Sequence, residues 1–421
     1  MHKLIKYAFL NVQKSIKIAQ KNLHMNTLLE QSEYLLSNTT LDFKRFLFNE
    51  IKWNNRLIGI KGARGTGKTT LSLQWLKQQD LPVTKAAYFS LDDLYFTNHS
   101  LKETIAQFHK QGGKMLVLDE VHKYKNWSTE IKNIYDIYTG IKIIFTGSSI
   151  IDIGRQEGDL SRRAIIYELP GLSYREFLSL KYNIQLPVFS LNEIMKDASA
   201  LKKQLPNSFR PLEYFNEYLQ TGYYPFMMED KETVHQKINQ LIRTIVEYDM
   251  AELKDFDIRN AKKILQLMYV ISQQVPFKPN LVKLAEKTNI HRNSLNNYLH
   301  YLEQAKLISM LQPSGKSTAV LQKPEKIYLN NTNLLYALAE QQVDKGNLRE
   351  TFFLSQLNVL SKMAIPKQGD FFVDNTYTFE IGGKDKSIKQ ISGIKNAWVV
   401  KDDLEFPIGN ELPLWMFGFL Y

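Results

Sequence analysis

The stretch Leu57-Ile-Gly-Ile-Lys-Gly-Ala-Arg-Gly-Thr-Gly-Lys-Thr-Thr70 decides the fold of this chain. It begins with a short apolar run and ends by opening a helical segment that reaches Lys77. Between them stands the pattern G-x-x-x-x-G-K-[ST], from Gly62 to Thr69. Between a strand and a helix, this pattern lets backbone N–H groups surround a phosphate at the amino end of the helix. The sequence therefore predicts a nucleoside-triphosphate-binding domain.

The residues that we expect to contact ATP are contiguous: Gly62, Ala63, Arg64, Gly65, Thr66, Gly67, Lys68, Thr69 and Thr70. Glycines in the loop allow the backbone to approach the phosphates closely. Lys68 would bridge the β- and γ-phosphates, and the Thr69 hydroxyl would bind Mg²⁺. ATP and Mg²⁺ are thus the expected ligands.

A second motif, Met115-Leu-Val-Leu-Asp-Glu120, is an apolar strand that ends in two carboxylates. Asp119 suits the hold on Mg²⁺, and Glu120 is placed to polarise a water for attack on the γ-phosphate. At the tip of the next apolar run, Thr146 and Ser148 both qualify to sense the γ-phosphate. These groups predict hydrolysis in addition to binding. His122 is either a contact of the acidic pair or a plain loop histidine.

The segment Asp159-Leu-Ser-Arg-Arg163 supplies two further cations. Either Arg162 or Arg163 can neutralise transition-state charge, in cis or across a subunit contact. The alternative is a basic pair on the surface.

Composition narrows the class of protein. The 421 residues exceed the size at which a single core stops growing, about 250–300 residues. The chain has no cysteine, which excludes a disulfide scaffold, cysteine-ligated zinc and a catalytic thiol, and fits a reducing cytoplasm. The net charge of +11 either favours a polyanionic partner or belongs to a solvated surface. No apolar run reaches the roughly 18–20 residues that span a bilayer, so we expect no stable membrane insertion.

The rest of the chain changes texture twice. Residues 170–270 have helical periodicity, and residues 276–311 fit two short helices, a turn and an opening strand, as in a winged helix-turn-helix. The candidate DNA contacts there are Lys283, Lys287, Arg292, Asn293 and Asn296. Such units are also often scaffolding between domains. At the other end, residues 1–24 form an amphipathic pattern that suits a membrane-surface helix, a docked helix, or a segment before a start at Met25.

Together the motifs resemble the AAA-like ATPases of the additional-strand, catalytic-glutamate division. The order of segments looks like one bacterial and archaeal family within it, which joins such an ATPase to a helix-turn-helix and a C-terminal domain of unknown function with a restriction-endonuclease-like fold. The resemblance runs from about residue 25 to the end and is carried by residues 56–70, 116–122, 145–149, 159–163, 168–177, 222–225 and 379–384. It implies ATP and Mg²⁺ binding and favours Arg163 over Arg162, but implies no defined cellular role.

The same resemblance draws attention to acidic residues near the C-terminus. Asp370 and Glu380 match the family's acidic positions, and Glu350 could complete the cluster. Between the first two, Asp374-Asn375 predicts a tight turn, with Glu380 on the returning strand. A nuclease of this fold needs a lysine two residues after the second acid, where this chain has Gly382. The nearest candidate replacements are Lys384, which we favour, and Lys389. A nuclease, a binding module that has lost the chemistry, and a solvated acidic hairpin all stay open.

We therefore expect an α/β parallel-sheet P-loop domain, a helical region, a winged helix-turn-helix and an α/β restriction-endonuclease-like domain. The expected ranges are 1–24 for an extension, 25–175 for the ATPase, 176–270 for a lid or linker, 271–330 for the winged helix and 331–421 for the last domain. The leading function is a slow or partner-stimulated Mg²⁺-dependent ATPase coupled to a DNA- or protein-binding region. An ATP-gated nuclease or defence-type protein, and a non-hydrolysing switch or adaptor, are the alternatives. An oligomer is compatible with each.

Overall fold

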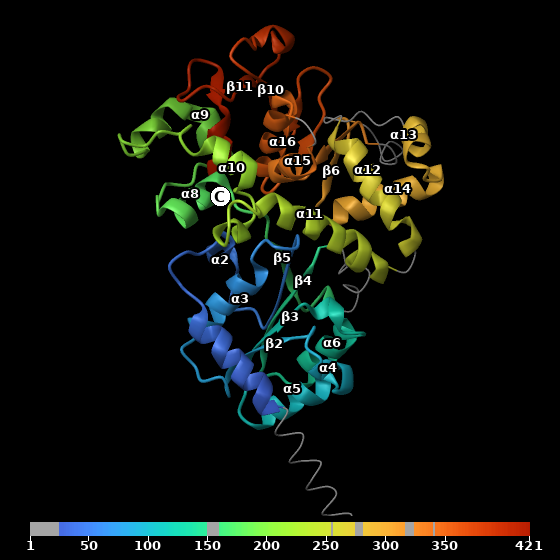
Figure 1. The fold of residues 1–421 in the computed structure, drawn as a ribbon. Coiled ribbons are helices and arrows are strands. Elements are labelled where there is room, and N and C mark those ends of the chain that lie inside the picture. Colours follow the sequence, from blue (N-terminus) through green and yellow to red (C-terminus); the bar gives the residue numbers. More distant parts are fainter. Residues whose placement is uncertain (1–24, 150–159, 254–255, 274–280, 316–323, 340–341) are drawn as a thin grey trace, which may run out of the picture. The chain divides into compact units, whose positions relative to one another are not determined.

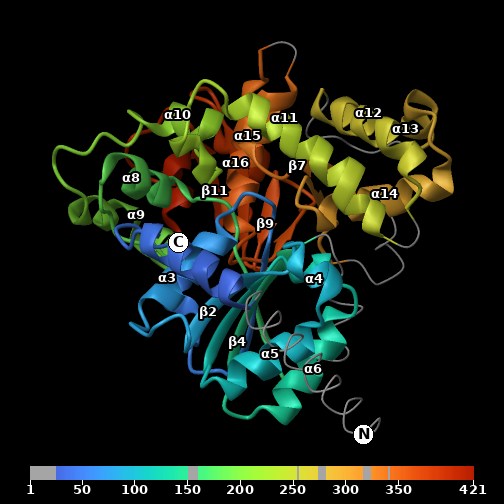
Figure 2. The same ribbon diagram turned by 60° about the horizontal axis from the view of Figure 1, so that its bottom comes forward.

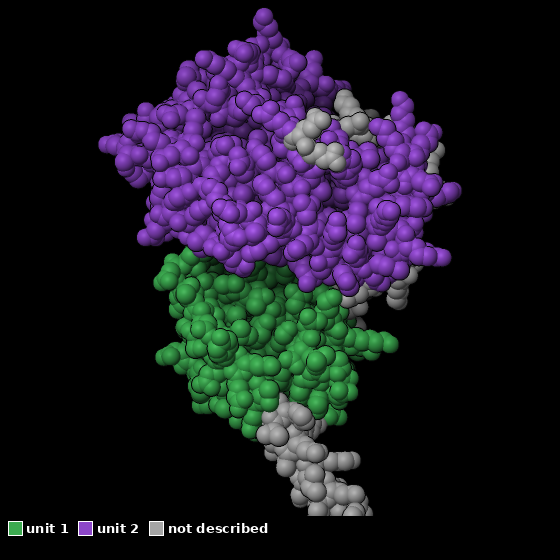
Figure 3. Space-filling model, in the orientation of Figure 1, with its two compact units in different colours: residues 1–62, 67–148, 152–169 green, residues 63–66, 149–151, 170–421 purple. Residues whose placement is uncertain are grey.

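The computed structural model describes residues 25–149, 160–253, 256–273, 281–315, 324–339 and 342–421. The amphipathic pattern of residues 1–24 lies outside this range, as do the side chains of Arg292 and Asn293. The chain divides into two compact units, coloured in Figure 3. The first unit comprises residues 1–62, 67–148 and 152–169, and the second comprises residues 63–66, 149–151 and 170–421.

A five-stranded parallel sheet forms the centre of the first unit, in the order β2-β3-β4-β1-β5 (Figure 1). Its strands are β1 (Leu57–Gly62), β2 (Ala86–Ser90), β3 (Met115–Asp119), β4 (Lys142–Ser148) and β5 (Ile165–Glu168). Four of them are the apolar runs of the sequence, so the predicted parallel α/β core is confirmed. We did not predict β5, a strand at the edge of the sheet in which Ile165 is 41% exposed.

Helices cover both faces of this sheet because successive strand residues point to opposite sides. On one face, Ile58 and Val117 pack with α2 (Leu47–Glu50) and α3 (Lys68–Lys77). On the other, Leu57 and Leu116 pack with residues of the helix over 25–38, α5 (Leu101–Lys110) and α6 (Trp127–Ile137), as Figures 1 and 2 show. The short helix α4 (Tyr95–Asn98) and the 3₁₀ turn η1 (Val121–Lys123) complete this unit.

The order of the strands brings three sequence motifs to one edge. The phosphate loop follows β1, the Asp119–Glu120 pair follows β3, and Thr146 lies near the end of β4, between those two strands. In parallel sheets the carboxyl ends of the strands form the ligand-binding edge.

The second unit begins with helices and ends in a mixed sheet. Its helices are α8 (Tyr174–Tyr182), α9 (Leu191–Leu201), α10 (Phe215–Thr221), α11 (Val234–Thr244), the π-helical turn η4 (Ile245–Asp249), α12 (Ala261–Ser272), α13 (Leu281–Thr288), α14 (Arg292–Gln304), α15 (Thr332–Leu338) and α16 (Lys345–Leu357). Short 3₁₀ turns are η2 (Lys202–Gln204), η3 (Pro225–Met228), η5 (Met250–Glu252), η6 (Ile258–Asn260), η8 (Ile388–Ile391) and η9 (Leu414–Phe419).

The mixed sheet has the order β12-β11-β10-β9-β8. It consists of β8 (Met363–Ala364), β9 (Phe371–Val373), β10 (Tyr377–Gly382), β11 (Ala397–Lys401) and β12 (Glu411–Pro413). The β9–β10 turn has positive φ at both Asp374 and Asn375, 49° and 52°, which matches the expected tight hairpin. A separate antiparallel pair, β6 (Ile308–Leu311) and β7 (Lys326–Leu329), follows α13 and α14.

Buried polar contacts tie the segments of the second unit together. The Asn333 side chain on α15 accepts from Tyr223 N at 2.8 Å and donates to Leu219 O at 2.9 Å, at the end of α10. Ser173 Oγ, before α8, donates to the carbonyl of Tyr421 at 2.8 Å. The Asn333 contacts join the ranges expected to be a lid and a C-terminal domain, and the Ser173 contact joins the end of the range expected for the ATPase to the same C-terminal range. The finer boundaries stay predictions.

The end of the first unit and the character of the chain's helices can be compared with the sequence. The first unit ends at Leu169, a few residues before the boundary expected at 175. Among the described residues, no helix has both the length and the apolar character that crossing a bilayer requires.

Candidate functional site

The phosphate loop has the backbone that its glycines permit. Gly65 and Gly67 have φ of 80° and 91°, and Gly67 is the N-cap of α3. Within the loop, Thr66 Oγ1 donates to the carbonyl of Ala63 at 2.9 Å. Lys68, the first residue of α3, is 5% exposed and its Nζ donates to the carbonyl of Gly62 at 3.0 Å. The loop therefore holds the lysine ammonium against its own backbone, at the amino end of a helix.

Asp119 is the centre of the polar network at the sheet edge. Its Oδ2 accepts hydrogen bonds from Thr69 Oγ1 and from Tyr88 Oη, each at 2.7 Å. Its Oδ1 accepts a hydrogen bond from Thr146 Oγ1. Asp119 is 3% exposed and Thr146 is fully buried. Three hydroxyl groups, on α3, β2 and β4, thus converge on the carboxylate of β3.

Tyr88 is a contact that we did not predict. Burial, the Asp119 charge and the hydrogen bond to Asp119 raise the pKa of Tyr88 well above its usual value of 10.0. The hydroxyl therefore keeps its proton and acts as a donor to Asp119. The signal available in the sequence was the hydroxyl group of Tyr88 within the largely apolar run Ala86–Ser90.

The donors around Thr69 fit a hard divalent cation. A hydroxyl and a carboxylate oxygen 2.7 Å apart are ligand types that Mg²⁺ prefers, and Mg²⁺ is usually bound through few protein groups plus phosphate and water. Among the residues that the structure describes, no cluster of three or more His, Asp or Glu side chains could hold a metal by itself. Thr69 and Asp119 are thus suited to a metal that arrives with a phosphate.

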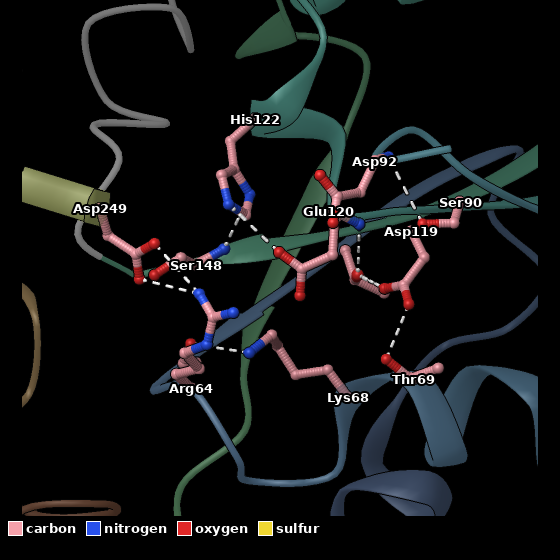
Figure 4. Close-up of polar contacts among 12 residues, drawn as sticks. Arg64, Lys68, Thr69, Ser90, Asp92, Asp119, Glu120, His122, Ser148 and Asp249 are labelled. Atoms are coloured by element: carbon pink, nitrogen blue, oxygen red, sulfur yellow. Dashed lines mark hydrogen bonds and ion pairs between the residues drawn. The ribbon is translucent and has the colours of Figure 1, made fainter. Parts of the chain in front are cut away.

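His122 lies between Glu120 and Ser148, as Figure 4 shows. Glu120 N donates to Thr146 Oγ1 at 3.3 Å. His122 Nε2 lies 3.1 Å from Glu120 Oε2, and Ser148 N donates to His122 Nδ1 at 3.4 Å. The structure therefore brings together Lys68, Thr69, Asp119, Glu120 and Thr146, with Ser148 contributing its backbone rather than a described side-chain contact.

The arginine candidates lie elsewhere in the first unit. Arg163 Nε and Nη2 donate to the carboxylate of Asp136 on α6, at 2.8 and 2.9 Å. The hydrogen bonds from Arg163 are the main reason why the pKa of Asp136 lies below its usual value. Arg162 is exposed. In this state, the Arg163 guanidinium is bound to α6.

The tip of the phosphate loop, residues 63–66, is part of the second unit. Within that unit, Arg64 Nη1 donates to both carboxylate oxygens of Asp249, at 3.0 and 3.2 Å (Figure 4). The Asp249 side chain has no exposed surface, whereas that of Arg64 is 43% exposed. A Cβ on Gly65 would lie 3.0 Å from Phe226 Cε1 and 3.3 Å from Leu241 Cδ1. We did not predict Asp249, which no sequence pattern connects to residue 64.

The C-terminal acidic residues gather near lysines other than Lys384. Lys326 Nζ on β7 lies 3.4 Å from Glu350 Oε2 and 3.7 Å from Asp370 Oδ1. Glu380 on β10 forms an ion pair with Lys386. Burial, and then the charge of Asp370, raise the pKa of Glu350, and burial is also the first cause of a raised pKa at Glu380.

Lys384 is exposed, and its carbonyl accepts a hydrogen bond from Lys401 Nζ at 3.1 Å. The ammonium nearest to Asp370 and Glu350 thus comes from a distant strand that the sequence did not indicate.

The candidate DNA contacts lie on the helices after α12. Lys283 and Lys287 on α13 are exposed, as is Asn296 on α14. The buried residues of α14 are Leu295, Tyr298, Leu299 and Leu302.

Comparison with known proteins agrees with the sheet and its loop. Residues 54–178 match the family model of an AAA domain, and residues 212–345 match that of a domain of unknown function (DUF8612). An uncharacterized protein of Methanocaldococcus jannaschii is 28% identical over 435 aligned positions, which cover 94% of this chain and 91% of that protein.

Solved structures give weaker matches. AMPPCP-bound DnaA from Aquifex aeolicus is 18% identical, with 62% of this chain and 85% of that chain covered and a TM-score of 0.25. PCH-2 of C. elegans is 14% identical, with 68% of each chain covered and a TM-score of 0.24. Scores this low carry no argument, so the assignment rests on the family model and on the observed sheet. Residues 54–178 are thus similar to an AAA domain, and their parallel sheet and phosphate loop agree with that similarity.

Proposed function

We propose that this protein binds ATP with Mg²⁺ and hydrolyses it, and that its nucleotide state is coupled to a DNA- or protein-binding region in the second unit. The observation that carries the proposal is the carboxylate of Asp119. It joins the phosphate loop, through Thr69, to the tip of β4, through Thr146, beside Glu120.

Each residue has a role that its position supports. Backbone N–H groups of the loop and the amino end of α3 favour a negatively charged phosphate, and Lys68 adds a buried ammonium beside them. Thr69 and Asp119 would hold Mg²⁺, which supplies charge neutralisation at the phosphates. Glu120 is placed to accept a proton from water, and Thr146 fixes its backbone.

Arg163 is the proposed transition-state arginine, with Arg162 as its alternative. Since Asp136 binds its guanidinium in this structure, the role requires that Arg163 leave α6 or act on another copy of the chain. Asp136→Asn would free the arginine without altering the network around Asp119.

The test is steady-state ATP hydrolysis by the full chain, with and without DNA, across a salt series. Glu120→Gln should lower turnover by roughly 10²–10⁴-fold, the usual contribution of a general base, and leave the affinity for a fluorescent ATP analogue within about twofold, since only proton acceptance is lost. Lys68→Ala should weaken binding itself. Negligible turnover in the wild type, unchanged in Glu120→Gln, would favour a non-hydrolysing switch or adaptor. Substantial turnover that is unchanged in Glu120→Gln would contradict the role of Glu120. Stimulation by DNA that fades with salt would identify nucleic acid as the partner, through Lys283, Lys287 and the net charge of +11.

Coupling to the second unit is supported by the contacts of the loop tip. Arg64 and Gly65 lie between phosphate-binding residues in the chain, and Asp249, Phe226 and Leu241 contact them within the second unit. A change in the conformation of the loop on nucleotide binding would therefore alter the contacts of η4, the turn that follows α11 and contains Asp249.

A second candidate, an ATP-gated nuclease, is favoured by one observation. Glu350 and Asp370 share the ammonium of Lys326, an arrangement of acids and lysine that could serve phosphodiester chemistry if a metal displaced the ion pairs. Nicking of plasmid DNA with Mg²⁺ or Mn²⁺ that is lost in Asp370→Ala would support it. A lack of nicking with both metals would discard it and leave the cluster as internal ion pairs.

A further inference from the structure

Glu120 occupies a backbone conformation that glutamate seldom adopts. Its φ and ψ are 50° and 43°, in the left-handed region, which is unfavourable for a residue other than glycine. Such strain persists only where surrounding contacts determine it. The 3₁₀ turn Val121–Lys123 follows directly and returns the chain, so that the side chain of residue 122 faces that of residue 120 (Figure 4).

His122 is buried at the point where this turn meets β4. Its side chain is 2% exposed, whereas that of Glu120 is 32% exposed. The ring lies between two partners: Ser148 N is 3.4 Å from Nδ1, and Glu120 Oε2 is 3.1 Å from Nε2. A backbone N–H can only donate, so Nδ1 must present its lone pair to Ser148.

The tautomer follows from this geometry. A neutral imidazole that accepts at Nδ1 carries its proton on Nε2, the nitrogen that faces Glu120. The Nε2–H of His122 therefore lies 3.1 Å from one oxygen of the Glu120 carboxylate, a close polar contact that does not have the alignment of a hydrogen bond. The chain of contacts runs from the backbone of Ser148, at the end of β4, through the imidazole to the carboxylate.

We propose that His122 is a positioning residue for Glu120, which fixes the plane of its carboxylate and ties that orientation to the tip of β4. A glutamate that is one-third exposed has several side-chain torsions free to vary, and a proton acceptor must lie within about 0.5 Å of its productive position. The buried Nε2–H dipole beside one oxygen attracts that oxygen electrostatically and so restricts the direction of the other. The inference rests on the proposed hydrolysis by Glu120 and names the residue that orients it.

The link to β4 gives this device a second consequence. Thr146, on the same strand, binds Asp119 and the backbone of Glu120, while Ser148 binds His122. A displacement of the end of β4 would move Glu120 by its backbone and by its side chain together. The position of Glu120 thereby depends on β4, the strand that carries the candidate γ-phosphate sensors Thr146 and Ser148.

The experiment compares His122→Ala, His122→Gln and the control His99→Ala in the full chain. His99 stacks on Tyr95 in the same unit, and its ring contacts the carbonyl of Tyr95. We expect His122→Ala to lower kcat by up to about tenfold, through the loss of a close polar contact with the Glu120 carboxylate, with the affinity for the ATP analogue within about twofold. Glutamine keeps an N–H donor and should restore most of the rate. His99→Ala should leave kcat unchanged, and unfolding midpoints identify any variant that is misfolded.

A double-mutant comparison separates positioning from structure. In the Glu120→Gln background, His122→Ala should cause no further loss of kcat, because the group that it orients is already inactive. The proposal is overturned if His122→Ala retains full kcat, if glutamine fails to rescue, or if the loss is the same in both backgrounds.

A second readout does not depend on hydrolysis. ¹⁵N spectra of the imidazole in nucleotide-free protein should show the proton of His122 on Nε2, and a proton on Nδ1 would overturn the geometry. If the wild type never hydrolyses ATP but the Nε2–H tautomer is found, the proposed function fails while the His122–Glu120 contact stands. If the wild type hydrolyses ATP but the proton of His122 lies on Nδ1, the proposed function stands and the positioning role of His122 fails.

Discussion

The ion pair between Arg64 and Asp249 leads to a prediction about how ATP binding affects the second unit. Arg64→Gln and Asp249→Asn each remove one partner while nearly preserving side-chain volume. Hydrogen bonds to charged groups contribute about 1.5–3 kcal/mol, and fully exposed ion pairs about 0–1 kcal/mol. Because Asp249 has no exposed surface and Arg64 is 43% exposed, we expect an intermediate coupling of about 1–2 kcal/mol.

This coupling can be measured in two ways. Urea unfolding of the two single variants and the double variant provides the coupling energy through a double-mutant cycle. Binding of a fluorescent ATP analogue provides its functional share. If Asp249 holds Arg64 so that the loop is already shaped for phosphate, each single variant should weaken ATP binding by up to about 5–30-fold. The double variant should bind no more weakly than either single one.

A matched control lies in the same unit. Arg259 and Asp257 form an ion pair at 2.7 Å with side chains that are 87% and 40% exposed, so their double variant should show neither coupling nor an effect on ATP. Hydrogen exchange over residues 245–253 should respond to ATP in the wild type and lose that response in Asp249→Asn. Additive effects in the cycle, or an ATP response that survives in Asp249→Asn, would refute the coupling.

Three further predictions concern the network and the core. Tyr88→Phe removes a 2.7 Å hydrogen bond to Asp119 and should raise the Mg²⁺ concentration for half-maximal turnover by about tenfold or more, since partners that orient a ligand carry that much affinity; unchanged Mg²⁺ dependence would contradict it. Gly59→Ala places a Cβ 2.5 Å from Ile166 Cδ1 in the sheet and should lower the free energy of unfolding by about 1–3 kcal/mol in urea, so an unchanged midpoint would count against the close packing. Burial by itself would raise the pKa of Glu217, but hydrogen bonds, the largest from Lys181, outweigh burial and lower the pKa to about 2 from the ordinary 4.5. The stability that this carboxylate contributes is therefore present above pH 4.5 and is lost as the pH falls toward 2. Glu217→Gln should remove up to about 3 kcal/mol at pH 7 and flatten the acid limb, and parallel pH curves for both proteins would show that this pairing is not stabilising.

Local patterns predicted the part of the fold that local physics controls. Apolar runs followed by helical periodicity indicated β1, β3 and β4, because strands buried on both faces must be continuously apolar. The edge strand β5 was missed because its half-exposed side chains lack that pattern. The left-handed turn at Asp374–Asn375 was predicted since both residue types tolerate positive φ.

The candidate site divides in the same way. The sequence by itself determined Lys68, Thr69, Asp119 and Glu120 as a group, because motif spacing and strand ends bring them to one edge of a parallel sheet. Only the tertiary structure decided that Tyr88 binds Asp119, that Asp249 binds Arg64, and that Lys326 rather than Lys384 faces Asp370. These pairs join residues distant in sequence, and each depends on strand order and helix packing, which are set by the burial of whole faces and not by any local pattern. The histidine at position 122 stands between the two cases: its place beside Glu120 was visible in the sequence, but its orientation required β4.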